Sequence, residues 1–124
     1  MTELKKINFE VLTEPIPLAR PRFSRNGAYL SQRSRDYRKI VQQAAQVAMA
    51  KFAPMTGELF CRLNFYRKFK ATCRNFGDLD NHIKAILDAL NGIVFADDAQ
   101  IVQCTASKHT DKTNPHVTIE IGEL

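Results

Sequence analysis

The segment Asp78–Val102 constrains the fold of this chain more than any other part of the sequence. It reads DLDNHIKAILDALNGIVFADDAQIV, and its apolar residues recur at the spacing that gives a helix one buried stripe. That stripe consists of Leu79, Ile83, Ile86, Leu87 and Leu90. The pattern predicts a helix from about Leu79 to Asn91, ended by Gly92, with acidic residues where it begins and a further Asp pair a few residues beyond its end.

Alternating apolar and polar residues predict the strands around this helix. The expected strands are Ile7–Leu12, Gly57–Tyr66, Gln100–His109 and His116–Ile121, with Asn114-Pro115 at the turn between the last two. An earlier helix, capped by Ser34, is expected to run to about Phe52, with Asp36 in its first turn. Its expected buried face consists of Tyr37, Ile40, Val41, Ala44, Ala48 and Phe52.

The order β-α-β-α-β-β predicts an α/β (α+β) fold with one mixed sheet and two main helices, although the order of the strands in the sheet does not follow from it. A length of 124 residues fits a single domain, residues 1–124. The irregular stretch Thr13–Arg33 is long for a compact domain, and its Asn26-Gly27 pair suggests a type I′ hairpin turn. The sequence has no long apolar run, signal peptide or CxxC pair, which predicts a cytoplasmic protein with reduced thiols and no membrane partner.

The positive charge is concentrated in two segments. Residues 15–40 carry seven cations and one acid, and residues 66–77 carry four cations and no acid, so eleven of the eighteen lysines and arginines lie there. The net charge of the whole chain is only +5, so the remainder is acidic, with its acids concentrated between Asp78 and Asp98. A single basic run is more often a solvated face, but two runs flanking an acidic cluster indicate nucleic-acid binding.

The acidic residues around the Asp78–Val102 helix predict a metal site. Asp78 and Asp80 lie at i and i+2 where the helix begins, and the pair Asp97-Asp98 follows the helix. Capping explains Asp78 and Asp80 taken alone, but it does not explain the second pair. Carboxylates without thiolates or paired histidines favour Mg²⁺, for which Mn²⁺ can substitute. Next to a basic surface, this site predicts a metal-dependent nuclease that uses no small-molecule cofactor.

The pattern D-L-D-N-x-x-K-A-x-x-D-A-L followed by D-D-A-Q-[IV]-V resembles the RusA family of Holliday junction resolvases, which are found largely in bacteriophages and prophages. The close match covers Asp78–Val102, and the P-x-P-x-x-R-P-R stretch at Pro15–Arg22 agrees more loosely. The resemblance implies a homodimeric, Mg²⁺-dependent endonuclease of DNA recombination and repair, which resolves branched four-way DNA junctions by paired symmetric phosphodiester hydrolysis. One position departs from the family: Gly77 stands where relatives often have a basic residue, and Arg74 is the nearest cation.

By this resemblance, Asp78, Asp80 and Asp98 match the metal-binding carboxylates, and Lys84 matches the active-site lysine. The metal would activate a water, and Lys84 would stabilise charge on the phosphate or orient that water. The supporting residues are Asp88, as a partner of Lys84, together with Asp97 and Asn81. The cations expected to bind DNA are Arg20, Arg22, Arg25, Arg33, Arg67, Lys68, Lys70 and Arg74.

Other residues near the motif carry weaker expectations. His82 is expected to face solvent on its helix. Tyr66, Phe69 and Phe76 either stack on unpaired bases or seal the sheet. Two alternative functions stay open: a nuclease selective for flaps or forks, and a non-catalytic junction-binding phage regulatory protein on a nuclease scaffold. Loss of a carboxylate would favour the second alternative, and all of them are present.

Overall fold

The structure is a computed structural model that describes residues 4–18, 22–25, 27–29 and 31–124. Its strands are β1 (Lys6–Val11), β2 (Arg22–Ser24), β3 (Gly27–Tyr29), β4 (Leu59–Arg67), β5 (Ile101–Thr110) and β6 (His116–Glu123). Its helices are α1 (Gln32–Met49) and α2 (Leu79–Leu90), and two 3-10 turns are η1 (Arg74–Phe76) and η2 (Asp98–Gln100). The predicted order β-α-β-α-β-β is confirmed, with the short β2–β3 hairpin added before α1.

Four strands form one mixed sheet in the order β1-β6-β4-β5. β6 is antiparallel to both β1 and β4, whereas β4 and β5 are parallel. Parallel neighbours need a crossover connection, and α2 lies in the one that joins β4 to β5. β5 and β6 follow each other along the chain but are not neighbours, because β4 lies between them. The predicted mixed sheet is therefore confirmed.

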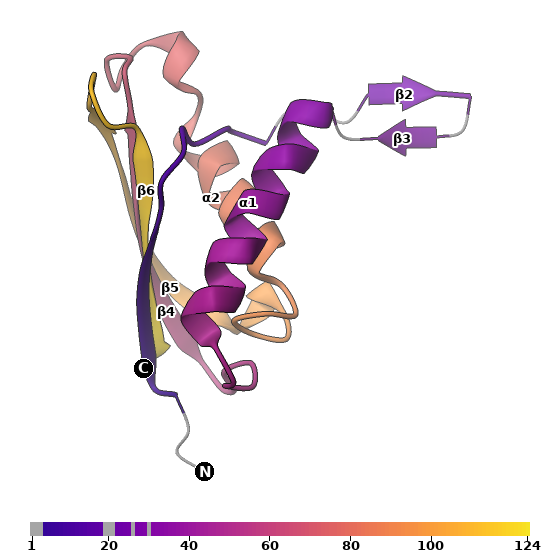
Figure 1. The fold of residues 1–124 in the computed structure, drawn as a ribbon, viewed down its shortest axis with the longest axis vertical. Coiled ribbons are helices and arrows are strands. Elements are labelled where there is room, and N and C mark those ends of the chain that lie inside the picture. The colour runs from indigo at the N-terminus through magenta and orange to yellow at the C-terminus, as the bar shows by residue number, and fades with distance from the viewer. Residues whose placement is uncertain (1–3, 19–21, 26, 30) are drawn as a thin grey trace.

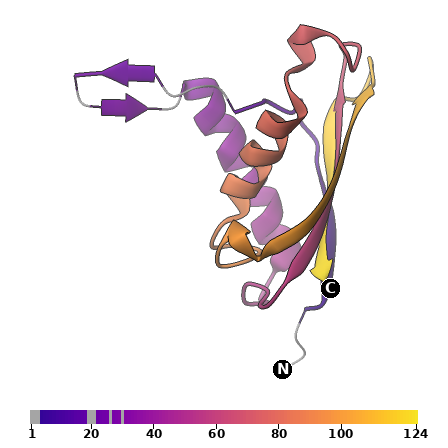
Figure 2. The ribbon, with the colours of Figure 1, turned by 180° about the vertical axis from the view of Figure 1, so that it is seen from behind.

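Both helices cover the same face of the sheet. Figure 1 shows α1 and α2 on one side of the strands, and Figure 2 shows the same arrangement from behind. Every second residue of β4 is buried, as expected for a strand in a sheet that helices cover on one face only. The buried core includes Leu59, Leu63 and Phe65 of β4, Val41 and Ala45 of α1, and Ile86, Ala89 and Leu90 of α2.

α1 begins and ends earlier than the sequence predicts. Ser31 is its N-cap, and the Ser31 hydroxyl accepts the backbone N–H of Ser34 at 3.2 Å. The predicted cap, Ser34, is thus a buried helical residue, and Asp36 lies beyond the first turn. Ile40 and Phe52 were expected in the core but are 42% and 43% exposed. The residues buried on α1 are Ser34, Tyr37, Val41, Ala45 and Met49.

The β2–β3 hairpin extends away from the sheet and the helices (Figure 1). Ser24 pairs with Gly27, so Gly27 belongs to the second strand of the hairpin and not to its turn. The expected place of Gly27 in the turn is therefore wrong, and because Asn26 lies outside the described residues, the type of the turn stays a prediction.

α2 matches the predicted helix to within one residue. Gly92 follows it with φ +81°, in the left-handed region that commonly terminates helices. The residues buried on α2 are His82, Ala85, Ile86, Ala89 and Leu90. The prediction that His82 faces solvent is wrong: its exposed fraction is 0%. His82 lies three residues after Leu79 and four before Ile86, so it continues the apolar stripe.

Candidate active site

Asp78 and Asp80 lie together at the N-terminus of α2. Asp78 is the N-cap residue, yet its side chain makes no capping hydrogen bond. Asp80 accepts the backbone N–H of Asn81 at 3.0 Å. Both carboxylates are exposed, and the positive end of the helix dipole favours negative charge there. The oxygens of Asp78 in particular are available to a ligand.

Lys84 follows Asp80 by one helical turn, and Asp88 follows Lys84 by another. Lys84 is exposed and Asp88 is half-buried. Among the described residues, Lys84 forms no ion pair with either aspartate. The expected pairing of Asp88 with Lys84 is therefore not formed, and the ammonium group faces solvent.

The second acidic pair lies beyond the C-terminal end of α2 and has a local structural role. Asp97 forms a capping box with Gln100, whose side-chain oxygen accepts the backbone N–H of Asp97 at 3.2 Å. The side-chain amide of Gln100 donates to the carbonyls of Met55 and Gly57 at 3.0 and 3.1 Å. Asp98 begins η2 and is half-buried. This network fixes the turn that carries Asp98.

The two acidic pairs lie at opposite ends of α2. A helix of 12 residues is about 18 Å long. The Lys108 ammonium donates to the carbonyl of Gly77, next to Asp78, at 3.1 Å. Lys108 lies seven residues along β5 from Ile101, so that strand carries the chain roughly 23 Å away from η2. Within the part of the chain that the structure describes, no three His, Cys, Asp or Glu side chains form a group that could hold a metal ion.

The predicted DNA-binding cations divide into three groups. Arg20 lies outside the described residues, as does the side chain of Arg22. The exposed cations are Arg25, Arg33, Lys68, Lys70 and Arg74. Three of these precede Asp78 in the loop between β4 and α2, so positive charge does flank the first acidic pair. Arg67 forms the third group by itself.

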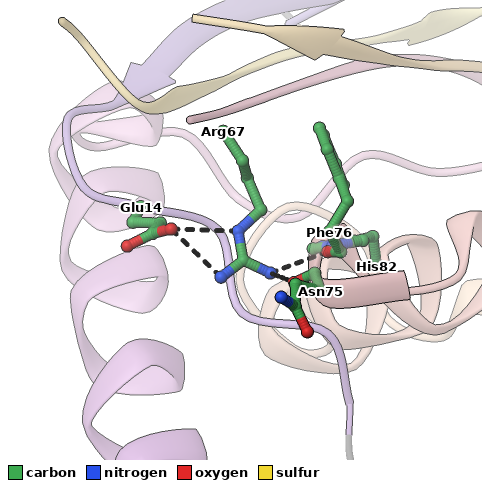
Figure 3. Close-up of polar contacts among 5 residues, drawn as sticks. All are labelled: Glu14, Arg67, Asn75, Phe76 and His82. Carbon is green, nitrogen blue, oxygen red and sulfur yellow. Dashed lines mark hydrogen bonds and ion pairs between the residues drawn. The ribbon is translucent and has the colours of Figure 1, made fainter. Parts of the chain in front are cut away.

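Arg67 is not a surface cation, and the prediction that it binds DNA is wrong. The residue is 4% exposed, because it continues the inward-facing alternation of β4. Its Nε and Nη2 atoms lie 3.1 and 3.0 Å from the carboxylate of Glu14. Its Nη1 donates to the carbonyls of Asn75 and Phe76 at 3.2 and 2.7 Å (Figure 3).

His82 is a second buried polar residue at this end of α2 that the sequence interpretation missed. Its Nε2 lies 2.7 Å from the carbonyl of Phe76, and since a carbonyl only accepts, Nε2 carries the proton. Its ring packs against Phe65 and Phe76, with centroid distances of 5.0 and 5.5 Å. Burial lowers the pKa of His82 to about 4, so the ring is neutral at neutral pH.

The aromatic residues before α2 serve mainly as structure. Phe76 is fully buried, and Phe69 packs against the core beneath Arg67, whose guanidinium carbon lies 4.9 Å from the ring centroid. Tyr66 stacks between His109 and His116 at centroid distances of 4.7 and 4.2 Å. For Phe76 the sealing role is therefore the correct one of the two expected.

Comparison of the sequence with known protein families identifies the class of protein to which this chain belongs. A family model described as "Endodeoxyribonuclease RusA" matches residues 13–122. The class is thus an endonuclease that hydrolyses DNA phosphodiester bonds. The chain belongs to the RusA endodeoxyribonuclease family, and membership implies a nuclease that resolves Holliday junctions and depends on a divalent metal.

One curated relative matches almost end to end. It is a protein of Bacillus subtilis (strain 168) with the name "Uncharacterized protein YqaN", 26% identical over 138 residues. The match covers 95% of this chain and 96% of the relative. In the described residues, no helix is both long and apolar enough to cross a membrane.

Proposed function

We propose that this protein is a Mg²⁺-dependent homodimeric endonuclease that resolves four-way DNA junctions by paired, symmetric hydrolysis. The family match over residues 13–122, which includes the whole acidic motif, carries this proposal. Asp78, Asp80 and Asp98 are its metal-binding residues, and Lys84 acts on the phosphate. The substrate is branched DNA.

The donor set of the acidic residues fits Mg²⁺. Asp78 and Asp80 offer exposed carboxylate oxygens, and no thiolate accompanies them. Hard oxygen ligands of this kind suit Mg²⁺, and Mn²⁺ can take its place. When bound, the metal supplies Lewis-acid activation of the scissile phosphate.

A dimer explains how Asp98 can serve the same metal as Asp78 and Asp80. In an isologous dimer with antiparallel α2 helices, the N-terminus of one helix lies beside the C-terminus of its partner. Each metal site then takes Asp78 and Asp80 from one subunit and Asp98 from the other. Half-buried apolar residues of α2, such as Ile83 and Leu87, offer contacts for such a pairing. Two equivalent sites are what paired incision of a near two-fold junction requires.

The chain's own side chains supply the remaining chemistry. Lys84 carries an unpaired, exposed ammonium one turn after Asp80, where it can stabilise charge that builds on the phosphate. Lys68, Lys70 and Arg74 are exposed in the loop before Asp78 and hold the DNA backbone by displacing its counterions. These cations do not select a sequence, so selection of the junction rests on the geometry of the dimer.

Cleavage of matched substrates tests the proposal. Four-way, forked and linear duplex DNA are incubated with the protein in Mg²⁺ and in EDTA, with Lys84→Ala as a control that keeps every carboxylate. We expect symmetric incisions in the four-way junction only, in Mg²⁺ only, and none with the variant. Equal cleavage of forks would identify a fork or flap nuclease instead. Junction binding without cleavage in Mg²⁺, and again with Mn²⁺ in its place, would identify a non-catalytic binding protein.

A further inference from the structure

The turn that delivers Asp78 is held by side chains from three separate elements. Three consecutive backbone carbonyls, those of Asn75, Phe76 and Gly77, each accept a hydrogen bond from a side chain. Exposed turns usually leave such carbonyls to water or pair them with nearby backbone. Here the donors come from β4, α2 and β5, so the turn is tied to the sheet and to the helix at once.

The strongest of these donors is Arg67. Its guanidinium reaches Asn75 and Phe76 on one side and Glu14 on the other (Figure 3). The carbonyl of Phe76 also accepts from His82, so two donors meet on one oxygen at 2.7 Å each. Lys108 adds the contact to Gly77 at 3.1 Å. A planar guanidinium is suited to this task, because it holds several acceptors in one fixed geometry.

Stability by itself does not account for Arg67. Its side chain is 5% exposed, while that of Glu14 is 30% exposed, so a charge is kept largely out of water. Desolvation of a buried ion pair commonly cancels its attraction, and well-packed apolar residues are often as stable. The ion pair with Glu14 holds the guanidinium of Arg67 in one orientation, in which it donates hydrogen bonds to the turn.

The segment that carries Glu14 closes the other side of the turn. The backbone N–H of Leu18 donates to the carbonyl of Asn81 at 3.0 Å. Gly77 has φ +94°, and a Cβ there would lie 2.7 Å from Cγ of Pro17 and 3.0 Å from Nε2 of His82. No larger residue fits without displacing Pro17 or His82. This accounts for glycine at this position.

We propose that Arg67, with Glu14 as its partner, is a positioning residue that fixes the turn 75–77 and so places the Asp78 carboxylate for metal binding. The inference rests on the proposed function, in which Asp78 is a metal ligand. Loss of the guanidinium removes two hydrogen bonds from the turn, leaves the Asn75 carbonyl without its side-chain donor, and lets the N-cap residue of α2 move. Residues that orient a metal ligand in this way typically change metal affinity or activity by about 10- to 100-fold when they are replaced.

Arg67→Lys tests the inference, because it keeps the charge and removes the fork. Arg62→Lys is the matched control: Arg62 is on the same strand and is also ion-paired, with Glu120 at 3.0 Å, but its side chain is 63% exposed on the other face. The first readout is amide hydrogen exchange of residues 76–79 in EDTA, which needs no activity. We expect exchange to be roughly tenfold faster in Arg67→Lys and unchanged in Arg62→Lys.

The second readout is the Mg²⁺ concentration that gives half-maximal junction cleavage. We expect it to rise about tenfold in Arg67→Lys, with junction affinity in EDTA unchanged and no effect in Arg62→Lys. Partial rescue by excess Mg²⁺ is expected, because the ligand is displaced but still present. A purely structural role would lower the melting temperature without shifting this metal requirement.

Unchanged exchange in Arg67→Lys overturns the inference, as does faster exchange with an unchanged metal requirement. If Arg67→Lys does not fold, Glu14→Gln takes its place, with a smaller shift in the same direction expected and no shift overturning the inference. If the parent cleaves no DNA, the proposed function fails, and the exchange data alone then show whether Arg67 fixes the turn.

Discussion

The two ends of α2 each present acidic side chains, but they are built in different ways. At the N-terminal end, the turn before Asp78 depends on Arg67, whose partner Glu14 is 53 residues away in sequence. At the C-terminal end, the turn that carries Asp98 depends on a capping box between Asp97 and Gln100, which is local and exposed. Buried side chains from three elements therefore fix the first end, whereas an exposed capping box, tied to Met55 and Gly57 through Gln100, fixes the second.

This difference matters because the proposed metal site needs both ends. Within one chain they are separated by a helix about 18 Å long, so a shared metal has to join the ends of two helices from two subunits. Displacement of the N-terminal turn would disturb a buried network of hydrogen bonds, while displacement of the C-terminal turn would disturb a largely exposed one.

The largest expected effect is the loss of cleavage in Asp80→Asn and in Asp98→Asn. Each variant keeps the shape of the side chain and removes one charged ligand, which should lower the cleavage rate on the order of 10³-fold or more. Junction binding in EDTA should be equal to or tighter than that of the parent, since a negative charge near the DNA is removed. Single-turnover cleavage and gel shifts measure the two quantities. A near-parental rate in either variant would remove that residue from the proposed site.

Mixing these two inactive variants tests whether the two ends meet across a dimer. If the site combines Asp80 of one subunit with Asp98 of the other, a mixed dimer contains one intact site and one doubly altered site. Subunit exchange should then restore roughly a quarter of the parental nicking rate, since half of the dimers are mixed and each nicks one strand. Either variant alone stays inactive and serves as the control. No recovery, with exchange confirmed by a labelled subunit, would show that the ends do not cooperate between subunits.

The sequence predicts the framework well because the framework depends on local patterns. Alternation located the four main strands, and Gly92 marked the end of α2. The strand order was out of reach, because β6 enters between β1 and β4 through contacts made by residues far apart in sequence. The cap of α1 was misplaced by three residues, since two serines in the same stretch compete for that role.

The buried polar residues were missed for a different reason. Arg67 was interpreted by its charge within a basic run, although it has the same parity on β4 as Leu63 and Phe65 and therefore points inward. Its partner Glu14 could not be paired with it from spacing. His82 likewise lies on the buried, apolar face of α2, although the predicted apolar stripe does not include it. For both residues the periodicity of the sequence predicts burial, whereas the polar side chain suggests exposure.

The N-terminal end should also dominate the pH dependence of stability. Burial lowers the pKa of His82 to about 4, so between that value and the ordinary 6.5 the unfolded chain binds a proton that the folded chain does not. The free energy of unfolding should therefore rise with pH across this window, by on the order of 3 kcal/mol, and level off above it. Urea unfolding in EDTA from pH 4 to 7 measures this slope. His82→Gln should flatten the slope of the free energy of unfolding against pH. His116→Gln, on the other face of the sheet, is the control and should leave that slope unchanged. A slope that persists in His82→Gln would show that other groups cause it.

The smallest effect is expected at the C-terminal end, from Asp97. Asparagine caps a helix as well as aspartate does, so Asp97→Asn should change neither stability nor cleavage appreciably. Asp97→Ala removes the cap and should lower the free energy of unfolding by about 1 kcal/mol. The cleavage rate should stay within about twofold of the parental rate, because Gln100 still donates to the carbonyls of Met55 and Gly57. Thermal melts and cleavage assays measure both quantities, with Asp98→Asn as the matched comparison one residue away. If Asp97→Asn lost cleavage as Asp98→Asn is expected to, Asp97 would be a metal ligand and not a cap.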